Sequence, residues 1–246
     1  MVAAQPSEVE PGAMRVAARF AEARTPRKPA DGYESLLREA KACRLCSLAG
    51  CATQTVFGEG PMQARAVFVG EQPGDQEDLQ GRPFVGPAGM LLRSALRDAG
   101  FSEGECYLTN AVKHFKFMPR GKRRIHKTPG VREIDHCRWW LDRELALVEA
   151  PLVVTLGASA LRAVAGPSAR LADMRGRPIA FGARTLLPTI HPAYLLRLPD
   201  PTAKEAETRA FAGDLKQAAF LAQGGLQEND SRSRPSSGQP LSRGGH

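Results

Sequence analysis

Short apolar segments alternate with segments of helical period between residues 64 and 223. Apolar runs of strand length occur at residues 64–70, 106–112 and 151–157, and around a glycine turn at 178–192, which reads as one or two strands. Apolar residues three and four positions apart predict helices at residues 87–100, 131–150, 158–166 and 201–223. This alternation predicts an α/β fold of three layers, α/β/α, with a mostly parallel central sheet.

The two ends of the chain differ from this pattern. Residues 1–30 lack sustained periodicity, and residues 225–246 are polar and of low complexity. We therefore predict disordered tails around a folded domain at residues 31–224. The N-terminus does not have the pattern of a secretory signal, and no segment approaches the roughly 18 apolar residues of a membrane span. A soluble, cytoplasmic monomer is expected.

The charge of the chain indicates an acidic partner. The formal net charge is +8 and the pI is about 9.6, which favours nucleic acid or a membrane surface. Tyr107–Arg132 contains no Asp or Glu, and its cations are interleaved with phenylalanines. A charge run is usually a solvated surface, but cations and rings in this order suit a nucleic-acid strand. The residues predicted to contact DNA are Lys113, Lys122, Arg123, Arg124 and Arg197.

Polar residues stand at the ends of three predicted strands. Glu71 and Gln72 follow the first, Asn110 lies near the end of the second, and His191 follows the last. Ligands of parallel sheets bind beyond the carboxyl ends of the strands, so these residues should meet at one site. The competing interpretations are a structural turn, a capping Asn and a structural His. As site residues, Asn110 could pair with a pyrimidine edge and His191 could stabilise an oxyanion or move a proton.

The segment at residues 70–89 contains five glycines and three prolines. A Gly-rich turn after a strand often cradles phosphate through backbone N–H groups. The lysine of a P-loop and the GxGxxG fingerprint are both absent, which argues against an enzyme of small phosphate-bearing substrates. Asp75 and Asp78 join Glu71 as candidate bases or water-positioning groups.

The cysteines indicate metal chemistry. Cys43 and Cys46 form a CxxC motif, and Cys137 follows some 90 residues later. With a distant further ligand, this spacing suits a structural zinc or an iron–sulfur cluster. The residues themselves leave the fourth ligand open, the candidates being His114, Cys51 and Cys106.

Three motifs resemble the uracil-DNA glycosylase superfamily, in that family's order. They are GEQPGDQED with GRPFVGPAG, then TNAVK, then HPAYLLR. The early CxxC and late cysteine resemble the iron–sulfur branch, family 4. The inserted KRRIH segment resembles the UdgX branch, whose members excise uracil and become covalently attached to DNA through that histidine. The resemblance covers residues 33–222 and implies uracil-containing DNA, expected to be single-stranded, as the substrate.

The resemblance also implies roles for single residues at the uracil. Phe84 would stack on the flipped base, Asn110 would read its edge, and His191 would hydrogen-bond its O2. The cofactor implied is a 4Fe–4S cluster. Relatives have a cysteine where this chain has His114, so the expected ligands are Cys43, Cys46, His114 and Cys137, with Cys51 in reserve.

At the sugar, the resemblance makes His126 the nucleophile. Glu71 and Gln72 occupy the motif that positions water or supports the sugar, and Asp75 belongs to the same substrate-binding segment. A neutral imidazole is a competent nucleophile towards C1′, and nearby cations would keep it neutral by lowering its pKa. Glu71 could accept the other ring N–H of His126.

Two further interpretations remain open at this point. A conventional glycosylase would share every motif but release abasic DNA to solvent. A non-catalytic, metal-stabilised DNA-binding module would use the basic loop only to grip phosphate, and would bind DNA without uracil equally well.

Overall fold

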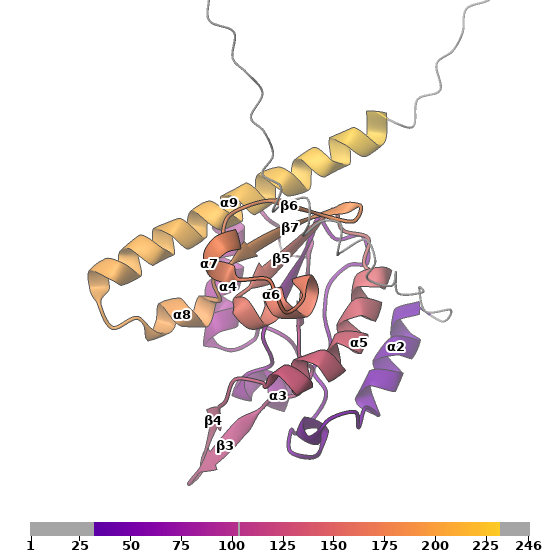
Figure 1. The fold of residues 1–246 in the computed structure, drawn as a ribbon, viewed down its shortest axis with the longest axis vertical. Helices are drawn as coiled ribbons and strands as arrows, with labels where there is room; N and C mark the ends of the chain where they lie inside the picture. The colour runs from indigo at the N-terminus through magenta and orange to yellow at the C-terminus, as the bar shows by residue number, and fades with distance from the viewer. Residues whose placement is uncertain (1–31, 103, 232–246) are drawn as a thin grey trace, which may run out of the picture.

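A computed structural model of the chain describes residues 32–102 and 104–231 (Figure 1). The predicted tail at residues 1–30 lies outside the described residues, as do residues 232–246 of the second tail. The last helix, α9, spans Pro201–Ser231 and so continues eight residues past its predicted end. None of the described helices is both long and apolar enough to cross a membrane.

The centre of the fold is a five-stranded sheet. Four of its strands pair in parallel, and the strand at one edge runs antiparallel, so the predicted α/β class is confirmed. The order across the sheet is β2 (Cys106–Asn110), β1 (Ala66–Gly70), β5 (Leu152–Leu156), β7 (Arg184–Thr189) and β6 (Ile179–Phe181).

Helices cover both faces of this sheet because its strands are apolar on both sides. In β1, Val67 and Val69 belong to one core cluster and Phe68 to the other, as the two-residue period of a strand requires. The first cluster contains α2 (Gly32–Lys41), α5 (Val131–Leu147), α6 (Ala158–Ala165) and α7 (Leu171–Met174). The second contains α4 (Pro87–Asp98), α8 (Pro192–Arg197) and α9.

Several short elements were not predicted. They are α2, the 3₁₀ turn η1 (Ser47–Gly50), α3 (Asp75–Gln80), α7 and α8. In most of them the helix is too short to display a hydrophobic period, and tertiary contacts hold it.

The basic loop also contains an unpredicted element. β3 (Phe117–Arg120) and β4 (Arg123–His126) form an antiparallel hairpin that projects from the body of the domain (Figure 1). Gly121 has a φ of 58° at the turn, and glycine is the residue that adopts positive φ most readily in two-residue hairpin loops. The Gly-Lys pair between two four-residue segments was the sequence signal for this turn.

Candidate active site

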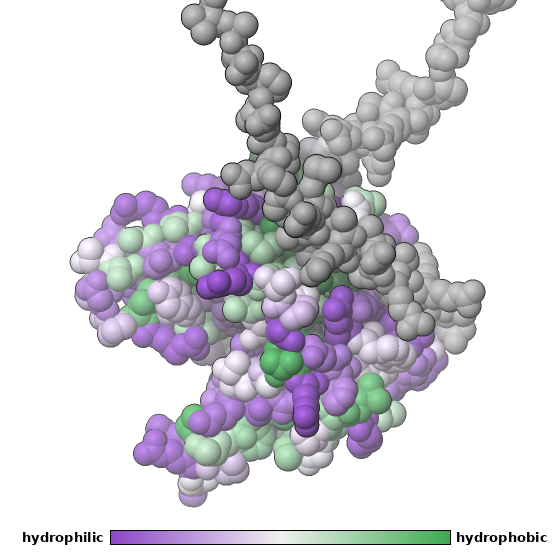
Figure 2. Space-filling model, viewed as in Figure 1, coloured by the Kyte–Doolittle hydropathy of each residue, from purple (hydrophilic) through white to green (hydrophobic). Residues whose placement is uncertain are grey.

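A cavity of about 470 Å³ opens beyond the carboxyl ends of β1, β2 and β7. Figure 2 shows the surface hollowed between the segment that carries α8 and the projecting hairpin. The convergence expected from the strand ends is present. The residues predicted from sequence that line the cavity are Glu71, Gln72, Asp75, Phe84, Asn110, His126, His191 and Arg197.

The floor of the cavity depends on two glycines. A β-carbon at Gly70 would lie 2.3 Å from Asn110 Oδ1 and 2.7 Å from Phe84 Cζ. A β-carbon at Gly89 would lie 2.2 Å from the backbone of Phe84, whose φ of 56° is unusual for a side chain of that size. The glycines thus let the Phe84 ring and the Asn110 amide approach each other at the end of β1.

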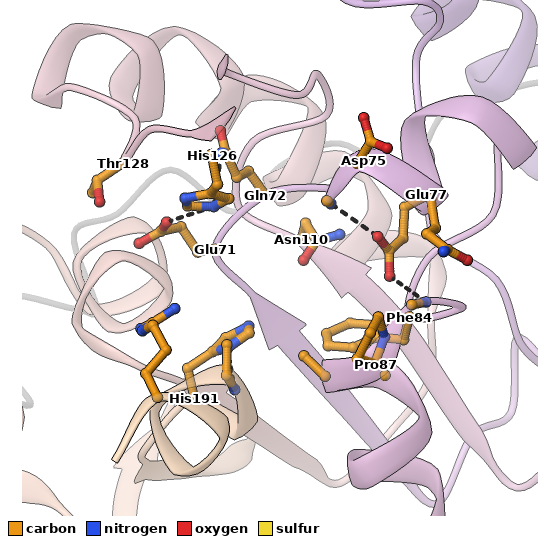
Figure 3. Close-up of a pocket in the computed structure, with 17 residues that line it drawn as sticks. Glu71, Gln72, Asp75, Glu77, Phe84, Pro87, Asn110, His126, Thr128 and His191 are labelled. Carbon is orange, nitrogen blue, oxygen red and sulfur yellow. Dashed lines mark hydrogen bonds and ion pairs between the residues drawn. The ribbon is translucent and has the colours of Figure 1, made fainter. Parts of the chain in front are cut away.

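Glu77 holds the Gly-rich segment in shape. Its carboxylate accepts hydrogen bonds from Gly74 N (3.0 Å) and Gly86 N (2.8 Å), the two contacts drawn in Figure 3. This side chain is buried and lines the cavity. Sequence reasoning missed Glu77, although a Glu three residues after the helix N-cap Gly74 matches the acidic half of a capping box.

His191 caps the first turn of α8. Its Nδ1 accepts a hydrogen bond from Ala193 N at 3.1 Å, so in the neutral ring the proton resides on Nε2. Burial, then the charges of Arg197 and His126, lower the pKa of His191 to about 4. His191 is therefore neutral at physiological pH, and Nε2–H is a hydrogen-bond donor.

His126, at the end of β4, faces Glu71 and Gln72 (Figure 3). Its Nε2 is 3.5 Å from Glu71 Oε1 and 2.9 Å from Gln72 Nε2. The Gln72 amide is oriented by Lys116 N, which donates to Oε1 at 3.1 Å. When Nε2 of His126 carries a proton, it can donate only to Glu71. When Nε2 carries the lone pair, it can accept only from the amide of Gln72.

Glu71 has a second partner that sequence reasoning missed. Ser159, in the first turn of α6, donates its hydroxyl hydrogen to Glu71 Oε2 at 2.6 Å. One carboxylate oxygen is thereby held by the serine, and the other is turned towards His126. A lone serine at a helix start gives no sequence signal for this contact, because the two residues are 88 positions apart.

The pKa of His126 is lowered, as expected, but the cause differs from the prediction. Burial has the largest effect, Glu71 opposes it, and the cation that assists is Arg197 of α8. The neighbouring cations of the loop do not contribute. Strand alternation turns the Arg123 side chain to the opposite face from His126. Arg124 lies on the same face as His126, but its charge is paired with Asp75 and Asp78.

Arg124 fastens the hairpin to α3. Its guanidinium pairs with Asp75 and Asp78, each at 2.5 Å, and lies over the rings of Phe115 and Phe117 at 5.4 and 5.1 Å. Arg124 was predicted to contact DNA and Asp75 to contact substrate. The two side chains form an ion pair with each other, and this contact joins the hairpin to α3 beside the cavity.

The prediction for Lys113 is corrected. Its side chain is 1% exposed and forms an ion pair with buried Glu144. Its Nζ also donates to Asn110 O (2.7 Å) and Thr109 Oγ1 (2.8 Å). Lys113 therefore cannot reach a DNA phosphate and instead holds the end of β2. Lys122, Arg123 and Arg197 are exposed, as a phosphate contact requires.

The predicted cluster ligands lie in one region of the fold. Cys43 and Cys137 are buried in the first core cluster, with Cys46 packed against it, and both Cys43 and Cys46 act on the pKa of Cys137. His114 is buried, donates to or accepts from Thr55 Oγ1 through Nε2 (3.0 Å), and leaves Nδ1 without a partner.

Two backbone or ring N–H groups point at these sulfurs. Lys113 N donates to Cys137 Sγ and Trp140 Nε1 to Cys43 Sγ, both at 3.2 Å. Among the described residues, no group of three or more His, Cys, Asp or Glu is close enough to hold a single metal ion. Three thiols and an imidazole whose Nδ1 has no hydrogen-bond partner are donors of the kind that an iron–sulfur cluster or a zinc ion accepts.

Comparison with known proteins identifies the family. Residues 57–216 match the model of the uracil DNA glycosylase superfamily. The chain belongs to this superfamily. It is 40% identical over 166 residues to the Type-4 uracil-DNA glycosylase of Thermotoga maritima, covering 67% of this chain and 83% of that protein.

Two further relatives with the same name support this assignment. The Type-4 uracil-DNA glycosylase of Sulfurisphaera tokodaii is 32% identical over 179 residues, covering 69% of this chain and 78% of the relative. That of Pyrobaculum aerophilum is 36% identical over 167 residues, covering 65% and 82%. The superfamily match spans all five strands of the sheet, the cavity and the hairpin.

Proposed function

We propose that the protein excises uracil from DNA and then keeps the DNA through a covalent bond from His126 to C1′ of the sugar. The observation that carries this proposal is the placement of His126. A neutral imidazole lies at the mouth of a cavity whose floor carries Asn110, Phe84 and a neutral His191.

Uracil recognition uses the floor. The base must leave the helical stack or come from a single strand to reach the cavity. Its ring would lie against Phe84, where an aromatic stack contributes about 1–3 kcal/mol per base. The Asn110 side chain offers one acceptor and two donors to the polar edge of the base.

Cleavage breaks the bond between C1′ and N1, and the electron pair leaves with uracil. The negative charge spreads to O2, where Nε2–H of His191 donates a hydrogen bond. A donor aimed at developing charge in a site shielded from water is an effective catalytic device. Because His191 is neutral, it stabilises the anion by hydrogen bonding, and the uracil anion takes its proton from solvent.

The second bond forms from His126. The ring nitrogen that carries the lone pair attacks C1′, and the imidazole becomes positively charged. Glu71, 3.5 Å from Nε2, stabilises that charge, and Ser159 keeps the carboxylate in place. The bond is that of an imidazolium to a sugar carbon, and no water is consumed.

The 4Fe–4S cluster is part of this proposal as a structural group. Cys43, Cys46, Cys137 and Nδ1 of His114 would hold it, and it would tie the start of the domain to α5 and the end of β2. His114→Ala should lower the iron content and the visible absorbance of the purified protein, whereas His114→Cys should retain both.

The test of the covalent step uses a labelled single-stranded oligonucleotide with one uracil and a thymine control. Wild-type protein should give a shifted band that survives boiling in SDS, only with uracil, and His126→Ser should abolish it. A band that persists with His126→Ser would refute the role of His126. Alkali-labile cleavage without a band would indicate a turnover glycosylase, and neither signal would indicate a DNA-binding module.

A further inference from the structure

The two faces of the β3–β4 hairpin have different surroundings: one contacts the domain and the other is exposed to solvent. The side chains of the hairpin alternate between them, and the inward face contains Arg124 and His126, which contact α3 and Glu71. On the outward face, Met118 stands directly opposite Ile125. These two apolar side chains are 47% and 36% exposed, and neither takes part in the proposed chemistry.

Cations surround this apolar pair. The next pair on the same face is Arg120 opposite Arg123, and Lys122 lies in the turn between them. Within the described part of the chain, no ion pair involves any of these three residues. The acid-free segment therefore presents unneutralised positive charge around two exposed apolar side chains.

Nucleic acid fits this surface better than a protein does. Phosphates complement the cations, and base faces complement the apolar pair without any sequence requirement. Met and Ile are among the side chains that insert between base steps in DNA complexes. An acidic protein surface would complement the cations, but its carboxylates would not complement the apolar side chains of Met118 and Ile125.

The position of the hairpin places this surface beside the entrance of the cavity. His126 and Thr128 line the cavity at the base of β4, and the hairpin projects below the hollow in Figure 2. A uracil that enters the cavity must separate from its neighbours in the stack. The faces of the neighbouring bases that had stacked on the uracil are then exposed, and an apolar protein surface could cover them.

We propose that Met118 and Ile125 form an apolar wedge against the bases next to the uracil nucleotide, with Arg120 and Arg123 on the adjoining phosphates. The wedge rests on the proposed function, because it assumes that the uracil nucleotide enters the cavity from this side. It adds a DNA contact that is separate from the cavity and from His126.

The experiment measures base unstacking directly. The probe is an oligonucleotide with 2-aminopurine next to a tetrahydrofuran abasic analogue, in single-stranded and duplex form, so that binding is followed without excision. Wild-type protein should raise the fluorescence, since 2-aminopurine brightens when it is unstacked. Met118→Ser/Ile125→Ser should lose most of this rise and bind the duplex at least about fivefold more weakly.

The matched control is Phe220→Ser, which removes a side chain that is 74% exposed on α9. It should bind and unstack like wild type. An unchanged fluorescence rise in the double variant would overturn the wedge. So would a change of sedimentation in the double variant without DNA, because the face would then be a contact between copies of the chain.

Uracil release and adduct formation by the wild-type protein are followed separately on a uracil oligonucleotide. If these fail while the fluorescence response depends on Met118 and Ile125, the proposed function is wrong and only the contact of the two side chains with unstacked bases remains. If they succeed and the response is unaffected by the double variant, the wedge is wrong and the proposed function stands. Arg120→Gln should reduce the salt dependence of binding by about one unit of slope.

Discussion

Lys113 and Glu144 form an ion pair in which neither side chain reaches solvent. Glu144 also accepts hydrogen bonds from Gly58 N at 2.8 Å and Tyr107 Oη at 3.0 Å. Lys113 in turn binds the carbonyl of Asn110, the residue at the floor of the cavity. A buried pair thus holds the strand end from which the uracil would be read.

We expect Lys113→Met to lower the free energy of unfolding by about 3–5 kcal/mol, because it leaves the Glu144 carboxylate buried without its cation. Replacing both residues, Lys113→Met/Glu144→Gln, should recover part of the loss. The control is Lys116→Met, which breaks the partly exposed pair with Glu133 and should cost about 0–1 kcal/mol. Denaturant unfolding measures all three, and equal effects of the two single variants would contradict the prediction.

Gly70→Ala should damage the cavity without unfolding the domain. The added methyl would meet the Asn110 amide and the Phe84 ring, so both must shift. A displacement on the order of 1 Å costs up to about a hundredfold in rate. Single-turnover uracil release should fall while DNA affinity is retained, and Gly50→Ala, where the methyl meets open space, should match wild type.

The pH dependence of adduct formation should follow His126. Its neutral form attacks, and burial lowers its pKa, so the rate should fall only as the pH drops through that lowered value. Arg197 lowers the pKa of His126 and Glu71 raises it. Arg197→Gln should therefore move the acid limb to higher pH, and Glu71→Gln should move it to lower pH.

The measurement for this prediction is the single-turnover adduct rate at saturating protein, from acidic to neutral pH. Saturation removes the effect of weaker DNA binding in Arg197→Gln. Shifts of the same sign in the two variants would contradict His126 as the titrating nucleophile.

Ser159→Ala should slow adduct formation by freeing the carboxylate of Glu71. The serine hydroxyl donates to one oxygen of Glu71 at 2.6 Å. Without this hydroxyl, the carboxylate can rotate and its other oxygen no longer points towards His126. Ser159→Thr keeps the hydroxyl and should restore the rate. Uracil-DNA affinity should remain at the wild-type value, and a parallel loss of affinity would indicate general damage to the site instead.

The exposed cations should set the salt dependence of binding. Each of Lys122→Gln and Arg123→Gln should reduce the slope of log affinity against log salt by about one. Arg124→Gln should act differently, because it releases the hairpin from Asp75 and Asp78 and should reduce the adduct yield. Arg209→Gln is the control that should leave the slope unchanged, because Arg209 is an exposed residue of α9 paired with Glu205.

The sequence was sufficient for the central architecture. Apolar runs and helical periods are local properties, and they predicted the parallel sheet and its principal helices. The polar residues at the strand ends followed from the same pattern, because parallel strands bring their carboxyl ends together. Glu71, Asn110 and His191 could therefore be placed at one edge of the sheet without knowledge of any contact.

Only the tertiary structure decided what the charged residues do. Lys113, Arg124 and Lys122 lie in the same basic segment, yet the first is buried against Glu144, the second is fixed to α3, and the third is exposed. Composition cannot separate them, because the partner carboxylates come from distant segments. For the same reason the sequence did not predict the contact between Ser159 and Glu71, which forms only after α6 has packed beside the end of β1.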